Sequence, residues 1–201
     1  LEPVAADGRV YVARKDHNTV CSLDSGTGEV LWRFTADGPV DSPPTVLGGL
    51  VLFGSADGRV YCLRASDGEL AWSFRAAPTE RRVLVSDRLE SAWPVHGSVL
   101  VRNGLAYCTA GRSTYLDGGI RVYALDPATG RPVHSTRLDT WSRTRRDARG
   151  KPFIPAHHIE GTRSQLLVSE GPYLYLGQYK LDLKLRKQKV PYVEPRDVNH
   201  E

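Results

Sequence analysis

Two groups of polar side chains in this chain of 201 residues carry functional groups that could do chemistry. The first is His157, His158 and Glu160, whose imidazole and carboxylate groups are of the kind that bind metal ions. Adjacent residues of a strand point to opposite faces, so these side chains would meet only on a bent loop completed by ligands from elsewhere. We therefore predict no metal site here.

The second group is spread over two segments and combines an indole, an imidazole, a guanidinium, a hydroxyl and a carboxylate. Both segments are longer than a simple repeat requires, and such insertions usually gather on one face of a repeat protein, where ligands or partners bind. We predict a binding face made of Trp93, His96, Arg112, Ser113 and Asp117. No serine, histidine and aspartate have the spacing of a nucleophilic triad, so we assign no catalytic residue.

Positive charge is concentrated in two stretches, although the net charge is only +4. The simpler interpretation makes residues 137–152 a solvated basic loop and residues 180–189 a half-buried outer strand. The alternative is an anion-binding surface at Arg143, Arg145 and Arg146 for lipid phosphate, polyanionic glycan or nucleic acid. Aromatic residues are nearly absent from both stretches, so the sequence does not favour specific nucleic-acid recognition.

The three cysteines, Cys21, Cys62 and Cys108, are too widely spaced for a zinc site or a redox pair. We expect them to be small buried apolar residues on strands. A Cys62–Cys108 bridge between neighbouring units stays open, because sequence alone does not give its geometry.

The elements that must position these residues are repeats. Residues 19–34 recur at 59–74 with valine, leucine, glycine, glutamate, tryptophan and phenylalanine in register, and a third copy at 121–138 has His134 in place of tryptophan. Short runs of β-branched, aromatic and aliphatic residues alternate with glycine-containing turns, which is typical of antiparallel hairpins. We predict an all-β fold of four-stranded antiparallel sheets, the blades of a partial β-propeller of three to four blades.

At one set of positions in the repeats, turn geometry and packing explain which residue types occur. Aspartate and threonine side chains can accept backbone N–H groups in a turn, glycine supplies the positive φ that closes it, and tryptophan fills the wedge between sheets. We predict structural docking roles for Asp24, Thr27, Gly28, Trp32, Gly68, Trp72, Asp126, Thr129 and Gly130.

The spacing of these residues resembles a known family. Ser22-x-Asp24-x-x-Thr27-Gly28-x-x-x-Trp32 is similar to the tryptophan-docking motif, A-x-D-x-x-T-G-x-x-x-W, of the quinoprotein-like (PQQ-like) β-propeller repeats. The second repeat departs from the motif at Arg64 and Asp67. This family includes pyrroloquinoline quinone (PQQ) dehydrogenases, BamB-like proteins of the outer-membrane assembly machinery, and PQQ-like repeat proteins of planctomycete-type bacteria.

The resemblance implies two functions and a location. The first is a non-catalytic scaffold of the bacterial cell envelope or periplasm that binds a protein partner or the remaining blades of its own chain, with no cofactor. The alternative is a fragment of a PQQ-dependent alcohol or sugar dehydrogenase, which would hold PQQ and calcium. That alternative lacks the adjacent cysteine pair of the alcohol-oxidising branch and recognisable calcium ligands, so we favour the scaffold.

The length predicts an incomplete ring, because propellers close with about four to eight blades. We expect blade units at 4–46, 47–95, 96–140 and 153–190 and a polar tail at 191–201, and we interpret the chain as a fragment of a longer propeller. No apolar run approaches the roughly 18 residues that a membrane helix needs.

Overall fold

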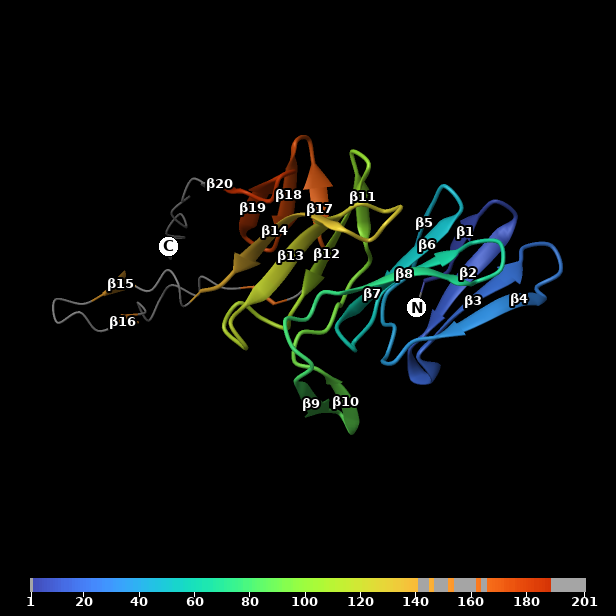
Figure 1. Ribbon diagram of the computed structural model, residues 1–201, viewed down its shortest axis with the longest axis horizontal. Coiled ribbons are helices and arrows are strands. Elements are labelled where there is room, and N and C mark those ends of the chain that lie inside the picture. The colour runs from blue at the N-terminus through green and yellow to red at the C-terminus, as the bar shows by residue number, and fades with distance from the viewer. Residues whose placement is uncertain (1, 141–144, 147–151, 154–161, 164–165, 189–201) are drawn as a thin grey trace, which may run out of the picture.

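A computed structural model describes residues 2–140, 145–146, 152–153, 162–163 and 166–188. Within them, four antiparallel sheets of four strands follow one another in chain order, from the blue first sheet to the orange-red fourth sheet (Figure 1). In each sheet the strands are hydrogen-bonded in the order of the sequence. Sheet 1 comprises β1 (Val4–Ala6), β2 (Arg9–Arg14), β3 (Thr19–Asp24) and β4 (Val30–Thr35).

The other three sheets have the same topology. Sheet 2 comprises β5 (Thr45–Leu47), β6 (Leu50–Gly54), β7 (Arg59–Arg64) and β8 (Leu70–Arg75). Sheet 3 comprises β11 (Leu100–Arg102), β12 (Leu105–Ala110), β13 (Ile120–Leu125) and β14 (Pro132–Leu138). Sheet 4 comprises β17 (Val168–Glu170), β18 (Tyr173–Leu176), β19 (Tyr179–Asp182) and β20 (Lys187–Gln188).

Two short hairpins lie outside these sheets. β9 (Arg82–Val85) pairs with β10 (Arg88–Ser91), and this hairpin projects away from the four sheets (Figure 1). β15 (Arg145–Arg146) pairs with β16 (Pro152–Phe153). A 3-10 turn, η1 (Lys15–His17), is the one helical element of the described residues, and none of them forms a helix long and apolar enough to cross a membrane.

The all-β prediction is confirmed, because the repeated sequences form repeated sheets. The register is the same in sheets 1 and 2: Trp32 lies opposite Ser22, and Trp72 lies opposite Cys62. Residue 46, where we placed the end of the first blade unit, lies inside β5, which pairs with β6 of sheet 2. The four unit boundaries themselves stay predictions.

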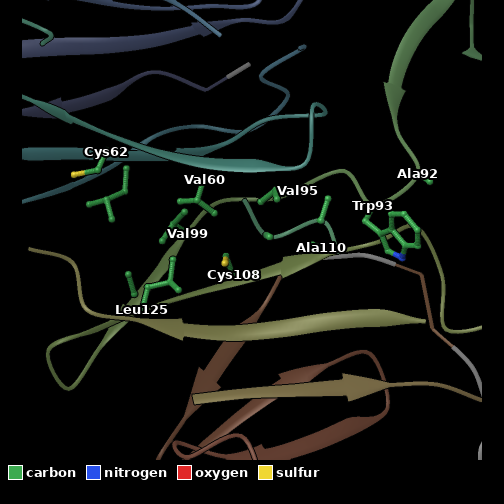
Figure 2. Close-up of a cluster of buried hydrophobic side chains, with 13 residues drawn as sticks. Val60, Cys62, Ala92, Trp93, Val95, Val99, Cys108, Ala110 and Leu125 are labelled. Carbon is green, nitrogen blue, oxygen red and sulfur yellow. The ribbon is translucent and has the colours of Figure 1, made fainter. Parts of the chain in front are cut away.

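Three hydrophobic clusters hold consecutive sheets together. The cluster between sheets 1 and 2 contains Val20 and Phe53, and the cluster between sheets 3 and 4 contains Val122 and Leu174. Figure 2 shows the middle cluster, between sheets 2 and 3. Because strand side chains alternate between faces, each inner sheet contributes to the cluster on either side of it.

All three cysteines are free and buried. Cys62 and Cys108 lie in the same cluster between sheets 2 and 3 (Figure 2). Burial raises the pKa of each of these two thiols to about 12, so at neutral pH they are protonated and act as packing groups.

Candidate functional site

Trp32 joins sheet 1 to the turn that follows β7 in sheet 2. Its indole N–H donates a hydrogen bond to the carbonyl of Ala65 at 2.9 Å, and its side chain is buried. A Cβ atom added to Gly68 would lie 2.6 Å from the Trp32 ring. Because Gly68 has no side chain, the Trp32 indole can occupy this space.

Trp72 makes the same pair of contacts between sheets 2 and 3. Its indole N–H donates to the carbonyl of Pro127 at 2.9 Å, and a Cβ atom on Gly130 would lie 2.5 Å from its ring. The turn is held by Asp126, whose Oδ1 accepts the backbone N–H of Thr129 at 3.2 Å. The turn thus places the acceptor carbonyl of Pro127 and the side-chain-free Gly130 together against the Trp72 indole.

The first and second turns reach this shape with different side chains. Oδ1 of Asp24 accepts the backbone N–H groups of Gly26 and Thr27, each at 2.9 Å, and these bonds lower the pKa of Asp24. In the second turn Arg64 stands where the motif has aspartate, and it forms a 2.7 Å ion pair with Asp67. In the second turn the acidic residue therefore stands at position 67 instead of position 64, and the turn itself is retained.

The third interface uses a different pair of residues. His134 lies opposite Ala124, at the tryptophan position. The acceptor carbonyl of sheet 4, that of Leu183, instead receives the hydroxyl of Tyr107 at 2.9 Å. Leu185, at φ +62°, is buried in the same cluster as Tyr107. Sequence reasoning missed this exchange, although the absence of tryptophan at 134 could have prompted a search for another donor.

The structure brings part of the predicted binding face together. The indole N–H of Trp93 donates to the carbonyl of Asp117 at 2.9 Å. Arg81 forms an ion pair with the Asp117 carboxylate, and its guanidinium lies 5.6 Å from the centroid of the Trp93 ring. The backbone N–H of Gly111 donates to the carbonyl of Pro94 at 3.0 Å, so the two segments are in direct contact.

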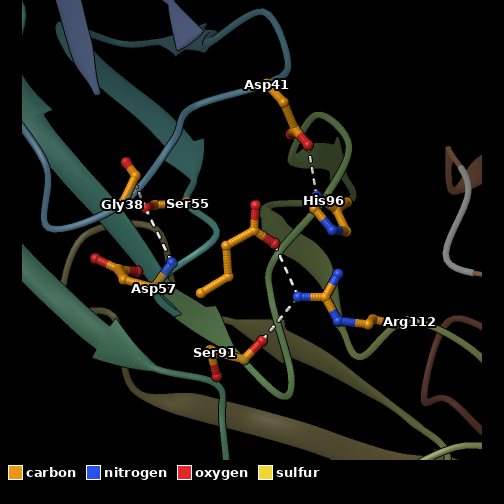
Figure 3. A network of polar contacts seen from close by, with 8 residues as sticks. Gly38, Asp41, Ser55, Asp57, Ser91, His96 and Arg112 are labelled. Carbon is orange, nitrogen blue, oxygen red and sulfur yellow. Dashed lines mark hydrogen bonds and ion pairs between the residues drawn. The ribbon is translucent and has the colours of Figure 1, made fainter. Parts of the chain in front are cut away.

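Arg112 connects this region to the projecting hairpin. Its Nη2 donates to the carboxylate of Glu90 at 2.8 Å and to the carbonyl of Ser91 at 3.1 Å (Figure 3). Its buried Nε has no hydrogen-bond partner among the described residues. Ser113 forms an isolated antiparallel bridge with Arg163. Arg112 and Ser113 therefore have contacts that hold the loop in place.

His96 forms a separate pair with Asp41, on the loop before β5. Nδ1 of His96 lies 2.5 Å from Oδ2 of Asp41 (Figure 3). Burial by itself raises the pKa of Asp41, but the hydrogen bond and charge of His96 outweigh it, and the pKa is lowered. The pair ties the loop before sheet 2 to the loop before sheet 3.

We expect His96→Phe to lower stability in a pH-dependent way. His96 holds the folded pKa of Asp41 below its unfolded value of about 3.9, so the pair stabilises the fold above about pH 4 and loses its effect as pH falls through the folded pKa. Removing the imidazole leaves a half-buried carboxylate without its partner, a loss of about 1–3 kcal/mol at pH 6. Urea unfolding between pH 3 and 7 should show this difference shrinking below about pH 4.

The matched control for this prediction is the same substitution in an Asp41→Asn background. There the effect of His96→Phe should be nearly independent of pH, because the titrating carboxylate is gone. A pH-independent loss in the chain that retains Asp41 would contradict the assignment.

A feature that sequence reasoning missed is a polar cavity of about 300 Å³ at the base of the β9–β10 hairpin. Its lining includes Asp57, Arg59, Arg82 and Ser91. Burial and the nearby charge of Asp37 raise the pKa of Asp57, although hydrogen bonds from Tyr61, Arg59 and Ser55 oppose the shift. The cavity therefore places an arginine from the hairpin near a partly buried carboxylate.

An exposed apolar pair lies on the same hairpin. Leu84 and Leu89 are cross-strand partners and are 70% and 62% exposed. Side chains alternate along a strand, so the two leucines share a face with Arg82 and Ser91, which line the cavity. The apolar run 83–85 before the Ser86-Asp87 turn was the available sign of this hairpin.

Several predicted residues lie outside the described part of the chain. They are His157, His158, Glu160 and Arg143. Arg145 and Arg146 form β15, and the anion surface at these positions stays a prediction. Among the described residues, no three histidine, cysteine, aspartate or glutamate side chains gather in a way that could hold a metal ion.

Comparison with known proteins identifies the repeats. A family model described as outer membrane protein assembly factor BamB matches residues 1–171. The dehydrogenase subunit of alcohol dehydrogenase (quinone) from Gluconacetobacter polyoxogenes is 27% identical over 140 residues, which are 64% of this chain and 18% of that protein. BamB from Burkholderia pseudomallei is 41% identical over 58 residues, 28% of this chain and 15% of that protein.

The fold agrees with these matches. The crystal structure of BamB from Moraxella catarrhalis aligns with a TM-score of 0.53 and 18% identity, over 93% of this chain and 62% of that one. The chain spans about a fifth or less of the length of these two curated relatives. The match over residues 1–171 and the four repeated sheets show that this chain belongs to the PQQ-like repeat family of β-propellers that the BamB model represents.

Proposed function

We propose that the chain is part of a non-catalytic β-propeller scaffold that binds another protein through the β9–β10 hairpin. The observation that carries the proposal is the exposed pair Leu84 and Leu89 on a hairpin that projects from the sheets. A two-stranded hairpin is only marginally stable by itself, and contiguous exposed apolar surface rimmed by polar residues marks interaction sites. The polar cavity beside it supplies a charged rim.

The contacts of the hairpin hold it in a fixed position relative to the sheets. Arg88 pairs with Asp16 of the η1 turn at 3.2 Å, and Glu90 pairs with Arg112 at 2.8 Å. These ion pairs use the face of the hairpin opposite the leucines, because residues 88 and 90 alternate with residue 89. The leucine face is therefore held outward.

The location that we propose is the bacterial cell envelope. The family model and two BamB relatives carry a name that places those proteins in outer-membrane assembly. A propeller in that compartment would present its hairpin to other envelope proteins.

Site-specific photo-crosslinking tests the scaffold. Benzoylphenylalanine at position 89 should give discrete protein adducts in cells of the source organism, and Leu84→Ser should abolish them. The matched control position is Val133, which is 49% exposed on an outer strand but lies away from the hairpin. Identical adducts from both positions, or no adduct from position 89, would refute hairpin docking.

A second candidate is part of a quinone-dependent dehydrogenase, favoured by the match to the alcohol dehydrogenase subunit over 64% of the chain. The described residues offer no cluster of three acidic, histidine or cysteine side chains for a metal such as calcium, so we assign no residue to it. Adding PQQ and calcium to the full-length gene product and measuring dye-linked alcohol oxidation separates the candidates. The scaffold predicts no turnover, and reproducible turnover would replace it with the dehydrogenase.

A further inference from the structure

The polar cavity at the base of the β9–β10 hairpin has walls that hydrogen bonds between three segments hold in place. The carbonyl of Gly38, in the loop before β5, accepts the hydroxyl of Ser55 at 3.1 Å (Figure 3). The backbone N–H of Ala56 donates to the carbonyl of Pro39, and the carbonyl of Ala56 accepts the N–H of Ser91, both at 2.8 Å. The cavity of about 300 Å³ is therefore preformed, at the lower end of the size range of ligand pockets.

The charged side chains of the cavity do not all neutralise one another. Three arginines and three acidic residues are in its lining, and Arg75 and Glu80 form a 2.8 Å ion pair. The other four form no ion pair with any residue that the structure describes, and they are Asp37, Asp57, Arg59 and Arg82. Two carboxylates and two guanidinium groups thus share one cavity without a charged partner.

The two carboxylates lie close enough to repel each other. Oδ2 of Asp57 accepts the hydroxyl of Tyr61 at 2.6 Å, and Oδ1 accepts the backbone N–H of Arg59 at 2.8 Å, so neutral donors fix this carboxylate. Burial and the nearby charge of Asp37 raise the pKa of Asp57. A cationic group between the two carboxylates would relieve this repulsion.

The two guanidinium groups are available to bind a carboxylate. Arg82 is exposed on β9, and Nη1 of Arg59 donates only to the neutral hydroxyl of Ser73, at 3.4 Å, among the described residues. Guanidinium groups bind carboxylates through paired N–H donors. Because no ion pair joins these arginines to Asp37 or Asp57, their charged atoms are more than 4.0 Å apart, and a ligand can bridge them.

We propose that this cavity binds a small zwitterion, a molecule that carries an ammonium group and a carboxylate a few bonds apart, as free amino acids do. The ammonium would lie between Asp37 and Asp57, and the carboxylate would be held by Arg59 and Arg82. A ligand with one charge would satisfy only one of these pairs. The proposal goes beyond hairpin docking and does not use the leucine face, so either site can fail without the other.

Nuclear magnetic resonance with a series of ω-amino acids tests the site. The probes are glycine, β-alanine, γ-aminobutyrate and 6-aminohexanoate, which separate the same two charges by increasing distances. At least one should give saturable shifts of the backbone amide resonances of residues 57–59 and 82. The amine and the carboxylic acid of matching chain length should each bind at least about tenfold more weakly, because each loses one set of charge-assisted hydrogen bonds. No saturable shift with any probe, or equal affinity for a singly charged analogue, would overturn the proposal.

Two variants of exposed cavity residues assign the two charges of the ligand. Arg82→Gln should reduce the preference for the zwitterion over the matching amine, and Asp37→Asn should reduce the preference over the matching acid. The matched controls Arg131→Gln and Asp87→Asn change exposed residues outside the cavity lining and should leave binding unchanged. A purely structural effect would weaken every probe alike. That result, or equal binding by both cavity variants and the native chain, would overturn the assignment.

Discussion

Replacing Trp32 by alanine is expected to lower the free energy of unfolding by about 3–5 kcal/mol, the usual cost of deleting a buried aromatic side chain. The indole is 8% exposed, packs 5.8 Å from the ring of Tyr11 and donates to the carbonyl of Ala65. Its removal leaves a cavity between sheets 1 and 2 and an unpaired carbonyl. Urea unfolding followed by far-ultraviolet circular dichroism measures the loss.

Trp32→Phe separates packing from hydrogen bonding in this experiment. Phenylalanine keeps an aromatic ring but has no N–H, so we expect an intermediate loss of about 1–3 kcal/mol. Val133→Ala, at an exposed position of an outer strand, should change stability by no more than about 0.5 kcal/mol. A Trp32→Ala loss below about 1 kcal/mol would contradict a docking role for the indole.

Gly130→Ala should destabilise the fold far more than Gly28→Ala. Both glycines have positive φ, at +71° and +76°, so alanine pays a similar backbone cost of about 1–2 kcal/mol at each. At residue 130 the new methyl group would also meet the Trp72 ring at 2.5 Å, whereas at residue 28 it would meet nothing within 4 Å. Overpacking adds about 1–3 kcal/mol at residue 130 alone.

Thermal and urea unfolding of the two variants measure this difference with the backbone cost held equal. The Gly130→Ala loss should decrease when Trp72→Phe is introduced, because the smaller ring relieves the clash. Equal losses for the two glycines would mean that the indole does not press on the turn.

Much of the fold could be predicted because its cause is local. Alternation along residues 9–14 and 19–23 and the turn at Asp24–Gly28 place strands β2 and β3 almost to the residue. The hairpin at residues 82–91 was not predicted, since its short apolar runs fall outside the repeat. The docking residues were singled out from their types, while the carbonyls of Ala65 and Pro127, which accept the two indole N–H groups, were not.

The candidate site could be predicted only in part. Trp93 and Asp117, which the sequence placed in insertions of neighbouring units, are joined by a hydrogen bond in the structure, and a binding face at these residues stays a prediction. Asp41 and Glu90, which pair with His96 and Arg112, were missed. Nothing local to either residue indicates a partner 55 or 22 positions away.

By itself the sequence determined the strands, the turns and the repeated order of the sheets, because these follow from the alternation of side chains and from turn chemistry over fewer than ten residues. Only the tertiary structure decided which turns are filled. Stacking covers Gly68 with Trp32 and Gly130 with Trp72, and it brings Tyr107 to the third interface, where His134 replaces tryptophan. The physical reason is that the burial of a turn depends on the side chain that the neighbouring sheet packs against it. Turns with the same backbone structure therefore become different sites.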